Sequence, residues 1–282
     1  MGLRITLVGG GKMGRALASG LIRAGEAREE HFLVIDPSDE ALRWWREELP
    51  GVACHRRWTP AVLDRAEDGG GDGAAIVVIA TKPQHVQQAA REGGAVGAGG
   101  WGGKLIVSIA AGITLQQLGA WFGTERIVRA MPNTPAMVGA GATAYCCSAA
   151  VTAEDRGRVE RIWGSIGIGI EVPENQMDAV TGLSGSGPAY VFAFIEALAD
   201  GGVMAGLPRD TALKLAAQTV AGAAIMVSQT GVHPAVLKDA VASPAGTTIA
   251  GLAKLEHNAF RGAAIEAVVA ASERSRELRQ SE

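Results

Sequence analysis

The sequence predicts an α/β domain with a doubly wound, mostly parallel sheet, followed by an all-α domain. In the first half, short apolar segments rich in β-branched residues alternate with segments of helical periodicity, the pattern of a parallel sheet with helices on both faces. Residues 74–80 form a continuous apolar run, as expected for a strand covered on both sides. Near residue 165 the strand patterns stop and Ala- and Leu-rich helical segments begin. We therefore expect domains at residues 1–165 and 166–282.

The elements of the first domain follow from where these patterns begin and end. Residues 5–8 are apolar or β-branched, and Ala16, Leu17, Leu21 and Ile22 then repeat at helical spacing. The further expected strands are residues 32–35, 52–54, 74–80, 105–109, 127–129 and 142–146. The further expected helices are residues 39–48 and 58–66 and a helix after Pro83. The glycine-rich stretches 67–73 and 93–103 are interpreted as surface connections.

Three glycines follow the first predicted strand at G-x-G-x-x-G spacing. Gly9 permits a tight turn, Gly11 lets a pyrophosphate approach the backbone, and Gly14 lets the next helix pack closely on the strand. The free N–H groups at the start of that helix favour phosphate. The second predicted strand ends in Asp36, about 20 residues further on, where an acid that binds the ribose hydroxyls is expected. This context indicates a Rossmann domain that binds a dinucleotide; the alternative is a glycine-rich turn without a ligand.

Three loops are expected at the carboxyl edge of the sheet, where α/β proteins bind their ligands. They are residues 9–14, 80–83 and 108–112, and the small residues of the third leave room for a nicotinamide ring. Lys82 is either a solvated lysine at a strand end or a cofactor contact, and the two interpretations are equally good. Residues 131–135 form either a loop that lines the site or a structural turn. The residues predicted to bind the cofactor are Val8, Gly9, Gly10, Gly11, Lys12, Met13, Gly14, Asp36, Ala80, Thr81, Lys82, Pro83, Ser108, Ala110 and Ala111.

The second half is predicted to be helical throughout. Helices are expected from about residue 188 to 205 and at 209–229, 234–241, 249–256 and 260–279. These helices carry apolar residues on more than one face. We therefore expect them to be buried against another subunit.

A glycine and two hydroxyl side chains, Gly246, Thr247 and Thr248, precede the helix expected at residue 249. One interpretation is an N-cap, since Thr is favoured there for backbone reasons alone. The other is a cradle for a small carboxylate, made of helix N-terminal N–H groups and hydroxyls. Residues 184–188 likewise combine glycines with hydroxyl side chains before an expected helix, and the same two interpretations apply to them.

Composition and charge exclude several classes of function. The 282-residue chain has a net charge of −3 and no long run of one sign, which argues against nucleic acid or an anionic membrane as the main partner. No apolar run approaches about 18 residues, and the cysteines have neither disulfide nor metal spacing. We expect a cytoplasmic protein without a metal. The histidines are scattered, so a reduction that needs no strong protein base fits better than a hydrolysis.

The sequence resembles one known family, the pyrroline-5-carboxylate reductases, over essentially the whole chain. The most specific match is HPAVLKDAVASPAGTTIAGL at residues 233–252. ATKPQ at 80–84, VSIAAG at 107–112, MPNTP at 131–135 and LSGSGPAY at 183–190 are similar to other blocks of the family. The resemblance implies reduction of 1-pyrroline-5-carboxylate to L-proline by NADPH or NADH. It also implies helical C-terminal domains interleaved in a homodimer, often assembled into decamers.

By this resemblance the substrate is a cyclic imine with one carboxylate. We expect the Thr248 hydroxyl to hydrogen-bond the ring nitrogen, stabilising or supplying its proton, with relay from water more favourable than donation by Thr248 alone. The residues predicted to bind the substrate are Val241, Ser243, Gly246, Thr247 and Thr248.

The sequence departs from the family pattern at several positions. Asp36 stands where the family commonly has Ser or Thr; an acid repels a 2′-phosphate and binds a free ribose diol, so it favours NADH. Arg56 and Arg57 would still hold a phosphate if their loop folds inward. Trp58 stands near a position where many members have Asn. Ala245 replaces the first of two glycines, which we expect to be a small change.

Two other functions fit parts of the sequence. A different Rossmann reductase of imines or β-hydroxyacids would place a lysine acid in the helical domain, where Lys214 and Lys238 are available without a matching motif. A dinucleotide-sensing or scaffold protein would bind NAD(P)H without turnover.

Overall fold

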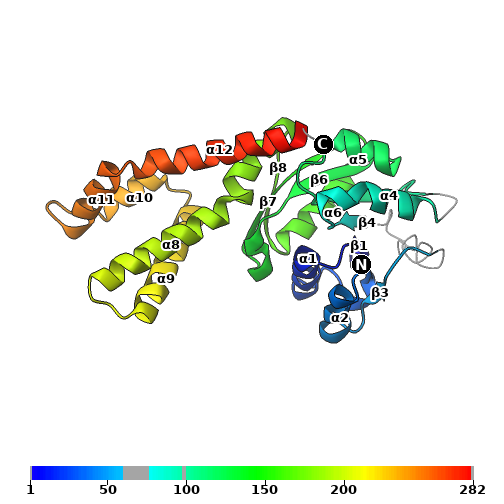
Figure 1. Cartoon of the computed structure of the whole chain (residues 1–282), viewed down its shortest axis with the longest axis horizontal. Coiled ribbons are helices and arrows are strands. Elements are labelled where there is room, and N and C mark those ends of the chain that lie inside the picture. Colours follow the sequence, from blue (N-terminus) through cyan, green and yellow to red (C-terminus); the bar gives the residue numbers. More distant parts are fainter. Residues whose placement is uncertain (1, 60–75, 97–99, 281–282) are drawn as a thin grey trace. The chain divides into compact units, whose positions relative to one another are not determined.

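The computed structural model describes residues 2–59, 76–96 and 100–280. The chain forms two compact units, which we call the sheet unit (residues 1–185 and 272–282) and the helical unit (residues 186–271) (Figure 1). The loop expected at 67–73, most of the helix expected at 58–66, and the start of the strand expected at 74–80 lie outside the described residues. The domain boundary at 165/166 stays a prediction.

Among the described residues, eight strands form one sheet in the order β3-β2-β1-β4-β5-β6-β7-β8. All neighbouring strands are parallel except β6 and β7, which are antiparallel. The strands are β1 (Ile5–Val8), β2 (Phe32–Ile35), β3 (Ala53–His55), β4 (Ile76–Ile79), β5 (Leu105–Ser108), β6 (Ile127–Met131), β7 (Gly141–Cys147) and β8 (Gly167–Glu171). The predicted doubly wound, mostly parallel sheet is confirmed.

The expectation that strands stop near residue 165 is wrong, because β8 pairs with β7 at the edge of the sheet. Its sequence contains two glycines, which are depleted in strands. Its two isoleucines, Ile168 and Ile170, are more than half exposed, so no buried apolar pattern marks it. Packing explains the glycine at position 169, since a Cβ there would meet the side chain of Trp163.

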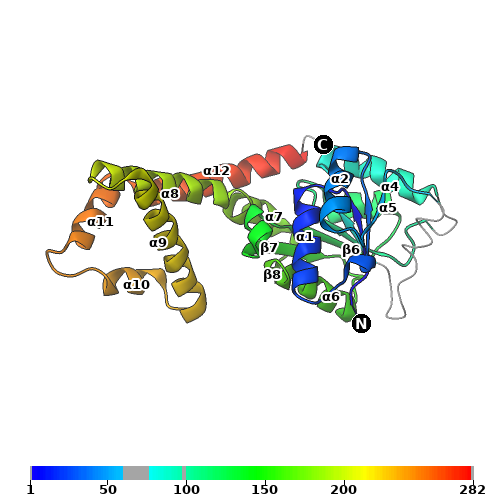
Figure 2. The ribbon, with the colours of Figure 1, turned by 90° about the horizontal axis from the view of Figure 1, so that it is seen from below.

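Helices cover both faces of the sheet. On one face, α1 (Lys12–Arg23), α2 (Asp39–Glu48) and α6 (Ala153–Gly164) share an apolar core with the strands (Figure 2). On the other face, α4 (Val86–Gly94) and α5 (Leu115–Phe122) contribute to a second core. Short segments join these elements: η1 (Glu29–His31), η2 (Pro83–His85), η3 (Thr134–Val138), η4 (Glu174–Gln176), α7 (Met177–Val180) and the π-helical turn η5 (Thr181–Gly185).

The helical unit contains α8 (Gly187–Met204), α9 (Arg209–Thr230), α10 (Pro234–Ala240), α11 (Thr247–His257) and the first part of α12 (Phe260–Gln280). The predicted all-α second half is thus confirmed for these residues. The buried apolar cluster of this unit is small and consists of Ala199, Ala212 and Ala216, with Ile195 and Val203 packed against it. Large apolar side chains on each of its helices are exposed. A single chain therefore leaves an extensive apolar surface uncovered.

Helix α9 is long and apolar enough to count as a possible membrane span among the described helices. Alanine and the larger aliphatic residues keep its mean hydropathy high, although Lys214 and Gln218 interrupt its apolar residues. Composition and length are weak evidence on their own, because helices of soluble proteins also meet them.

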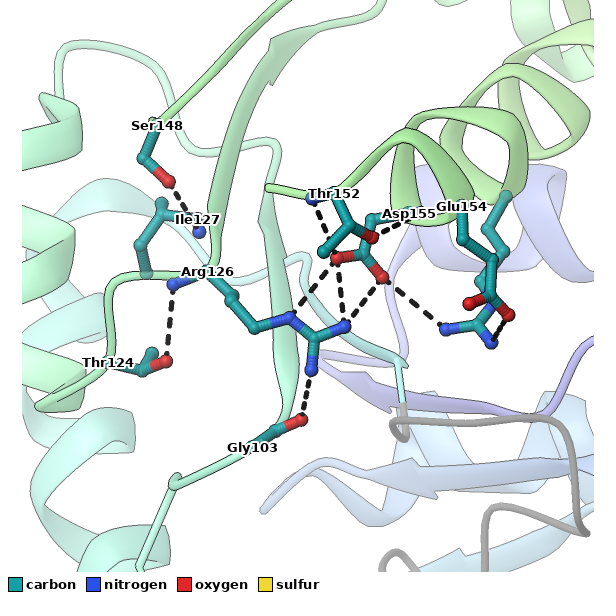
Figure 3. A network of polar contacts seen from close by, with 9 residues as sticks. Gly103, Thr124, Arg126, Ile127, Ser148, Thr152, Glu154 and Asp155 are labelled. Atoms are coloured by element: carbon teal, nitrogen blue, oxygen red, sulfur yellow. Dashed lines mark hydrogen bonds and ion pairs between the residues drawn. The ribbon is translucent and has the colours of Figure 1, made fainter. Parts of the chain in front are cut away.

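A buried ion pair joins the start of β6 to the start of α6 (Figure 3). Asp155 is fully buried and accepts hydrogen bonds from Arg126 Nε (3.1 Å) and Nη2 (2.7 Å). Arg126 Nη1 donates to the Gly103 carbonyl (2.6 Å), and the Thr152 N–H donates to Asp155 (3.2 Å). Burial by itself raises the pKa of Asp155, but the hydrogen bonds from Arg126 and Thr152 outweigh it, so the pKa lies below its usual value.

Replacing Asp155 should therefore destabilise the fold in a pH-dependent way. Asp155→Asn is expected to lower the free energy of unfolding by about 3 kcal/mol near neutral pH, because it leaves Arg126 without its anionic partner. The pKa of Asp155 is about 3.9 in the unfolded chain and lower in the folded chain. The stabilisation is thus present above about pH 4 and is lost as the pH falls further.

Chemical unfolding of the wild type and of Asp155→Asn, between neutral pH and about pH 3, measures the difference in their free energies of unfolding. The matched control is Glu154→Gln, which removes a charge from a side chain that is 70% exposed, in the same helical turn. It should cost less than about 1 kcal/mol. A stability difference that stays constant with falling pH would contradict the assignment.

Candidate functional site

A cavity of about 600 Å³ lies at the carboxyl edge of the sheet, where the strand order reverses between β1 and β4. Open α/β sheets bind ligands at this point. The ends of β1, β2 and β4, the residues after β3, and one face of α4 form its walls. The predicted cofactor residues in its lining are Val8, Gly9, Gly11, Asp36, Ala80, Thr81 and Lys82, together with Arg56 and Arg57.

The three glycines of the motif have different surroundings. Gly9 has φ +105°, and a Cβ there would meet backbone atoms of Ala80. A Cβ at Gly14 would meet the carbonyl oxygen of Gly9. A Cβ at Gly11 would enter open space, so no described part of the chain requires glycine at that position. Gly11 is the N-cap of α1, and its expected role in giving room to a pyrophosphate stays a prediction.

The peptide groups of Gly10 are fixed by three side chains. The Gly10 N–H donates to Asp36 Oδ2 (2.7 Å), and the Gly10 carbonyl accepts from Trp45 Nε1 (2.9 Å) and Arg15 Nε (3.1 Å). The Arg15 guanidinium also lies 4.8 Å from the ring centroid of Trp44. Helix α1 begins after Gly11 without a side-chain cap. Its first N–H groups therefore stay available for an anion.

Asp36 directly follows β2, and its two carboxylate oxygens accept hydrogen bonds from the N–H groups of Gly10 (2.7 Å) and Ser38 (2.8 Å). A carboxylate offers about four acceptor positions. Asp36 can therefore hold the glycine loop and still accept hydrogen bonds from ribose hydroxyls. Arg56 and Arg57 are exposed at the same cavity and supply positive charge near it.

Sequence reasoning missed the polar face of α4 and the supports of the glycine loop. His85, Gln88 and Glu92 line the cavity, and Gln88 Nε2 donates to Glu92 Oε1 (2.8 Å). Their spacing on one helical face is a signal that would have found them. Trp45 and Arg15 support the loop by side-chain hydrogen bonds to the Gly10 carbonyl, and Trp45 does so from a distant segment. The sequence offers no pattern for these contacts.

Trp58 forms an apolar wall of the cavity. It is 6% exposed and packs edge to face on Trp101, with ring centroids 5.2 Å apart. Trp58 and Thr59, the described part of the helix expected at 58–66, are not helical. An indole ring thus closes the part of the cavity near Arg57.

The remaining predicted cofactor residues do not line the cavity. These are Gly10, Lys12, Met13, Gly14, Pro83, Ser108, Ala110 and Ala111. The loop after β5 lies at the same edge of the sheet, because β5 is parallel to β4. Ser108 is fully buried, and its Oγ accepts the Ala110 N–H (3.3 Å). Contact between these residues and a cofactor stays a prediction.

The loop at 131–135 has a structural role. The Asn133 amide donates to the Ser184 carbonyl (3.1 Å), and its oxygen accepts the Ala142 N–H (2.9 Å). A Cβ at Gly185 would meet the side chain of Met131. The loop therefore holds the π-helical turn before α8 in place.

The predicted substrate-binding residues lie in the helical unit, around the start of α11. The helix begins at Thr247, with Gly246 as N-cap and no side-chain capping bond. The N-cap interpretation of Thr247 and Thr248 is therefore wrong, because both lie inside the first turn. The first N–H groups of a helix have no acceptor within the helix. At α11 they are available to a small carboxylate.

The turn before α11 is tight. The Gly246 N–H donates to the Ser243 carbonyl (3.0 Å), and a Cβ at Gly246 would meet the Ser243 hydroxyl. Ala245 has φ +58°, in the left-handed region that favours glycine. The expectation that Ala245 replaces a glycine at small cost is wrong, because this conformation costs a non-glycine residue about 1–2 kcal/mol. Val241 follows α10 as its C-cap residue.

Four ionisable groups away from the cavity have a hydrogen-bond or ion-pair partner or a raised pKa. Burial raises the pKa of Cys146 to about 11 and that of Cys147 to about 12, so both are neutral thiols near pH 7. His233 Nδ1 accepts a backbone N–H at the start of α10 (3.2 Å), and Lys238 pairs with Asp239 (3.4 Å). Within the described ranges, no three or more His, Cys, Asp or Glu residues are grouped to hold a metal ion.

Comparisons with known proteins cover both units. The family model described as pyrroline-5-carboxylate reductase dimerisation matches residues 174–278, and the model described as NADP oxidoreductase coenzyme F420-dependent matches residues 4–112. The chain is 44% identical to a pyrroline-5-carboxylate reductase of Arabidopsis thaliana, covering 99% of this chain and 96% of that protein. It is 40% identical to a pyrroline-5-carboxylate reductase of Escherichia coli strain K12, covering 99% of both.

Solved structures give the same match. A pyrroline-5-carboxylate reductase from Coxiella burnetii is 34% identical, with a TM-score of 0.86 over 99% of both chains. A pyrroline carboxylate reductase from Plasmodium falciparum, solved with NADP bound, is 33% identical, with a TM-score of 0.81 over 98% of both chains. Each likeness extends over the whole chain.

The different reasons for Gly9 and Gly11 predict different phenotypes. Gly9→Ala should destabilise the protein by about 2–4 kcal/mol, because it adds left-handed strain and a clash with Ala80. Gly11→Ala should change the free energy of unfolding by less than about 1 kcal/mol and weaken nucleotide binding by about tenfold or more. Chemical unfolding and calorimetric titration with ADP-ribose measure the two effects. Unchanged ADP-ribose affinity in Gly11→Ala would contradict the role assigned to Gly11.

Proposed function

The chain belongs to the pyrroline-5-carboxylate reductase family, and from this premise we propose how its residues serve the reaction. It is an oxidoreductase that reduces 1-pyrroline-5-carboxylate to L-proline with NAD(P)H, the last step of proline biosynthesis. The observation that carries the site proposal is the open space at Gly11, beside the uncapped start of α1. An incoming pyrophosphate is the ligand that this arrangement fits.

The cavity is proposed to take the adenosine half of the cofactor. Asp36 would accept hydrogen bonds from the ribose hydroxyls, Trp58 would contact the adenosine, and the N–H groups at the start of α1 would face the pyrophosphate. When bound, the reduced nicotinamide supplies the hydride that the imine carbon receives. The loops at 80–83 and 108–111 would border the nicotinamide end, since both follow parallel strands at that edge.

The start of α11 is proposed to hold the substrate. The first-turn N–H groups, including those of Thr247 and Thr248, would bind the carboxylate. The N–H of Gly246 is excluded from this role because it donates to Ser243 within the turn. The Thr248 hydroxyl would hydrogen-bond the ring nitrogen and, with water, maintain its proton. The chain's main contribution is then to orient a substrate that is already electrophilic.

The surroundings of Lys238 and Lys214 argue against a lysine of the helical unit as the proton donor. Lys238 is 51% exposed and pairs with Asp239, and Lys214 lies on α9, outside the turn that is proposed to bind the substrate. The alternative from the sequence, a reductase of keto acids or of other imines, would need such an acid. Oxidation of NADH and NADPH, followed separately with 1-pyrroline-5-carboxylate, other cyclic imines and keto acids, distinguishes the two.

The helical unit is proposed to form a homodimer, with further assembly to decamers. Its exposed apolar side chains, including those of α9, would be buried by packing against the same unit of a second copy. Burial between subunits also accounts for the high mean hydropathy of α9 without a membrane. We propose a cytoplasmic enzyme whose partners are its substrate, its cofactor and its own copies.

The role of Thr248 is tested by two substitutions of similar volume. Thr248→Val removes the hydroxyl and should lower kcat by about 10- to 1000-fold, whereas Thr248→Ser keeps the hydroxyl and should retain most of the activity. Steady-state kinetics with 1-pyrroline-5-carboxylate measures both. Unchanged kcat in Thr248→Val would remove Thr248 from the mechanism.

Asp36 should favour NADH over NADPH, because its charge opposes a 2′-phosphate. Asp36→Asn removes the charge and keeps an acceptor for the Gly10 N–H, so it should shift the ratio of kcat/KM for the two cofactors toward NADPH by about tenfold. Asp36→Ala, which also removes the support of Gly10, should in addition weaken binding of both cofactors. A ratio that does not move in Asp36→Asn would show that another residue sets the preference.

A further inference from the structure

Arg56 and Asp36 lie at neighbouring positions on the sheet edge. Strands β2 and β3 are parallel, with Ile35 opposite His55, and the Asp36 N–H donates to the His55 carbonyl (3.1 Å). Asp36 and Arg56 directly follow these paired residues, and both line the cavity. Adjacent strands are about 5 Å apart. A group bound at Asp36 is therefore within reach of the Arg56 side chain.

The Arg56 guanidinium is already paired with another carboxylate. Its Nη1 lies 3.1 Å from Oδ2 of Asp39, the first residue of α2. Asp39 lies in the first turn of α2, where the helix dipole favours a negative side chain. Asp39 therefore competes with any phosphate for the Arg56 guanidinium.

We propose that Asp39 withholds Arg56 from the 2′-phosphate of NADPH and so adds to the preference for NADH that Asp36 sets. This inference rests on the proposed function, in which the cavity holds the adenosine half of the cofactor. The two carboxylates act differently: Asp36 repels the phosphate directly, and Asp39 occupies the cation that would bind it. NADH lacks this phosphate, so its binding does not depend on the Arg56–Asp39 pair. Asp39 is in this sense a positioning residue for cofactor selection.

The effect is expected to be modest. The side chains of Arg56 and Asp39 are 63% and 56% exposed. Exposed ion pairs contribute little, so releasing Arg56 should change affinity for the 2′-phosphate by about two- to fivefold. Asp36 is the larger determinant, because its charge faces the phosphate in every arrangement of Arg56.

Binding of two cofactor fragments, ADP-ribose and 2′-phospho-ADP-ribose, tests the inference. Calorimetric titration of the whole enzyme should show that Asp39→Asn binds 2′-phospho-ADP-ribose about two- to fivefold more tightly and ADP-ribose with unchanged Kd. The gain should vanish in the double variant Asp39→Asn with Arg56→Gln. Asp39→Glu keeps the carboxylate and should behave as the wild type. In turnover, Asp39→Asn should lower KM for NADPH and leave kcat unchanged.

Glu40→Gln is the matched control, because it removes a negative charge from the next exposed residue of α2. An equal gain in Glu40→Gln, or a gain that persists without Arg56, would show a general charge effect and overturn the inference. Unchanged binding in Asp39→Asn would overturn it as well. A wild-type enzyme that binds neither fragment would instead reject the proposed cofactor site, and the inference with it.

Discussion

The hydrogen bond between the Gly10 N–H and the Asp36 carboxylate is the contact on which the cofactor site depends. It joins the glycine loop after β1 to the end of β2, the two segments that would meet the pyrophosphate and the ribose. Trp45 and Arg15 fix the other side of the same residue through its carbonyl. The loop is thus held in shape without a ligand, which reduces the ordering cost of binding.

This contact gives Asp36 two roles that a sequence pattern cannot separate. As an acceptor it supports the loop, and as a charge it is proposed to discriminate between ribose and ribose 2′-phosphate. A serine or threonine hydroxyl in its place would keep a smaller acceptor and lose the charge. Asp36 and Trp58 are the two departures from the family pattern that the sequence indicates at this cavity. Trp58 forms an apolar wall there, and Arg56 beside it is paired to Asp39.

Much of the fold could be predicted because strands such as β2 and β4 are fully buried and carry unbroken apolar runs. β8 could not, because its glycines and exposed isoleucines lack any buried pattern. In the candidate site, the spacing of the glycines and the position of Asp36 could be predicted, because they match a known motif. The bonds of Trp45 to Gly10 and of Arg56 to Asp39 join residues from different elements. Such side-chain contacts depend on tertiary packing, and no periodic pattern in the sequence predicts them.

The turn before α11 shows how local strain is tied to the proposed substrate site. Ala245 holds a left-handed conformation that glycine would adopt more easily, and it persists because its neighbours determine the turn. The Gly246 N–H is bound to the Ser243 carbonyl, which places the helix start directly after it. Thr247 and Thr248 therefore enter the first turn, with their N–H groups free of helical acceptors. The strain at Ala245 thus accompanies the arrangement that leaves these two N–H groups available for the carboxylate that they are proposed to bind.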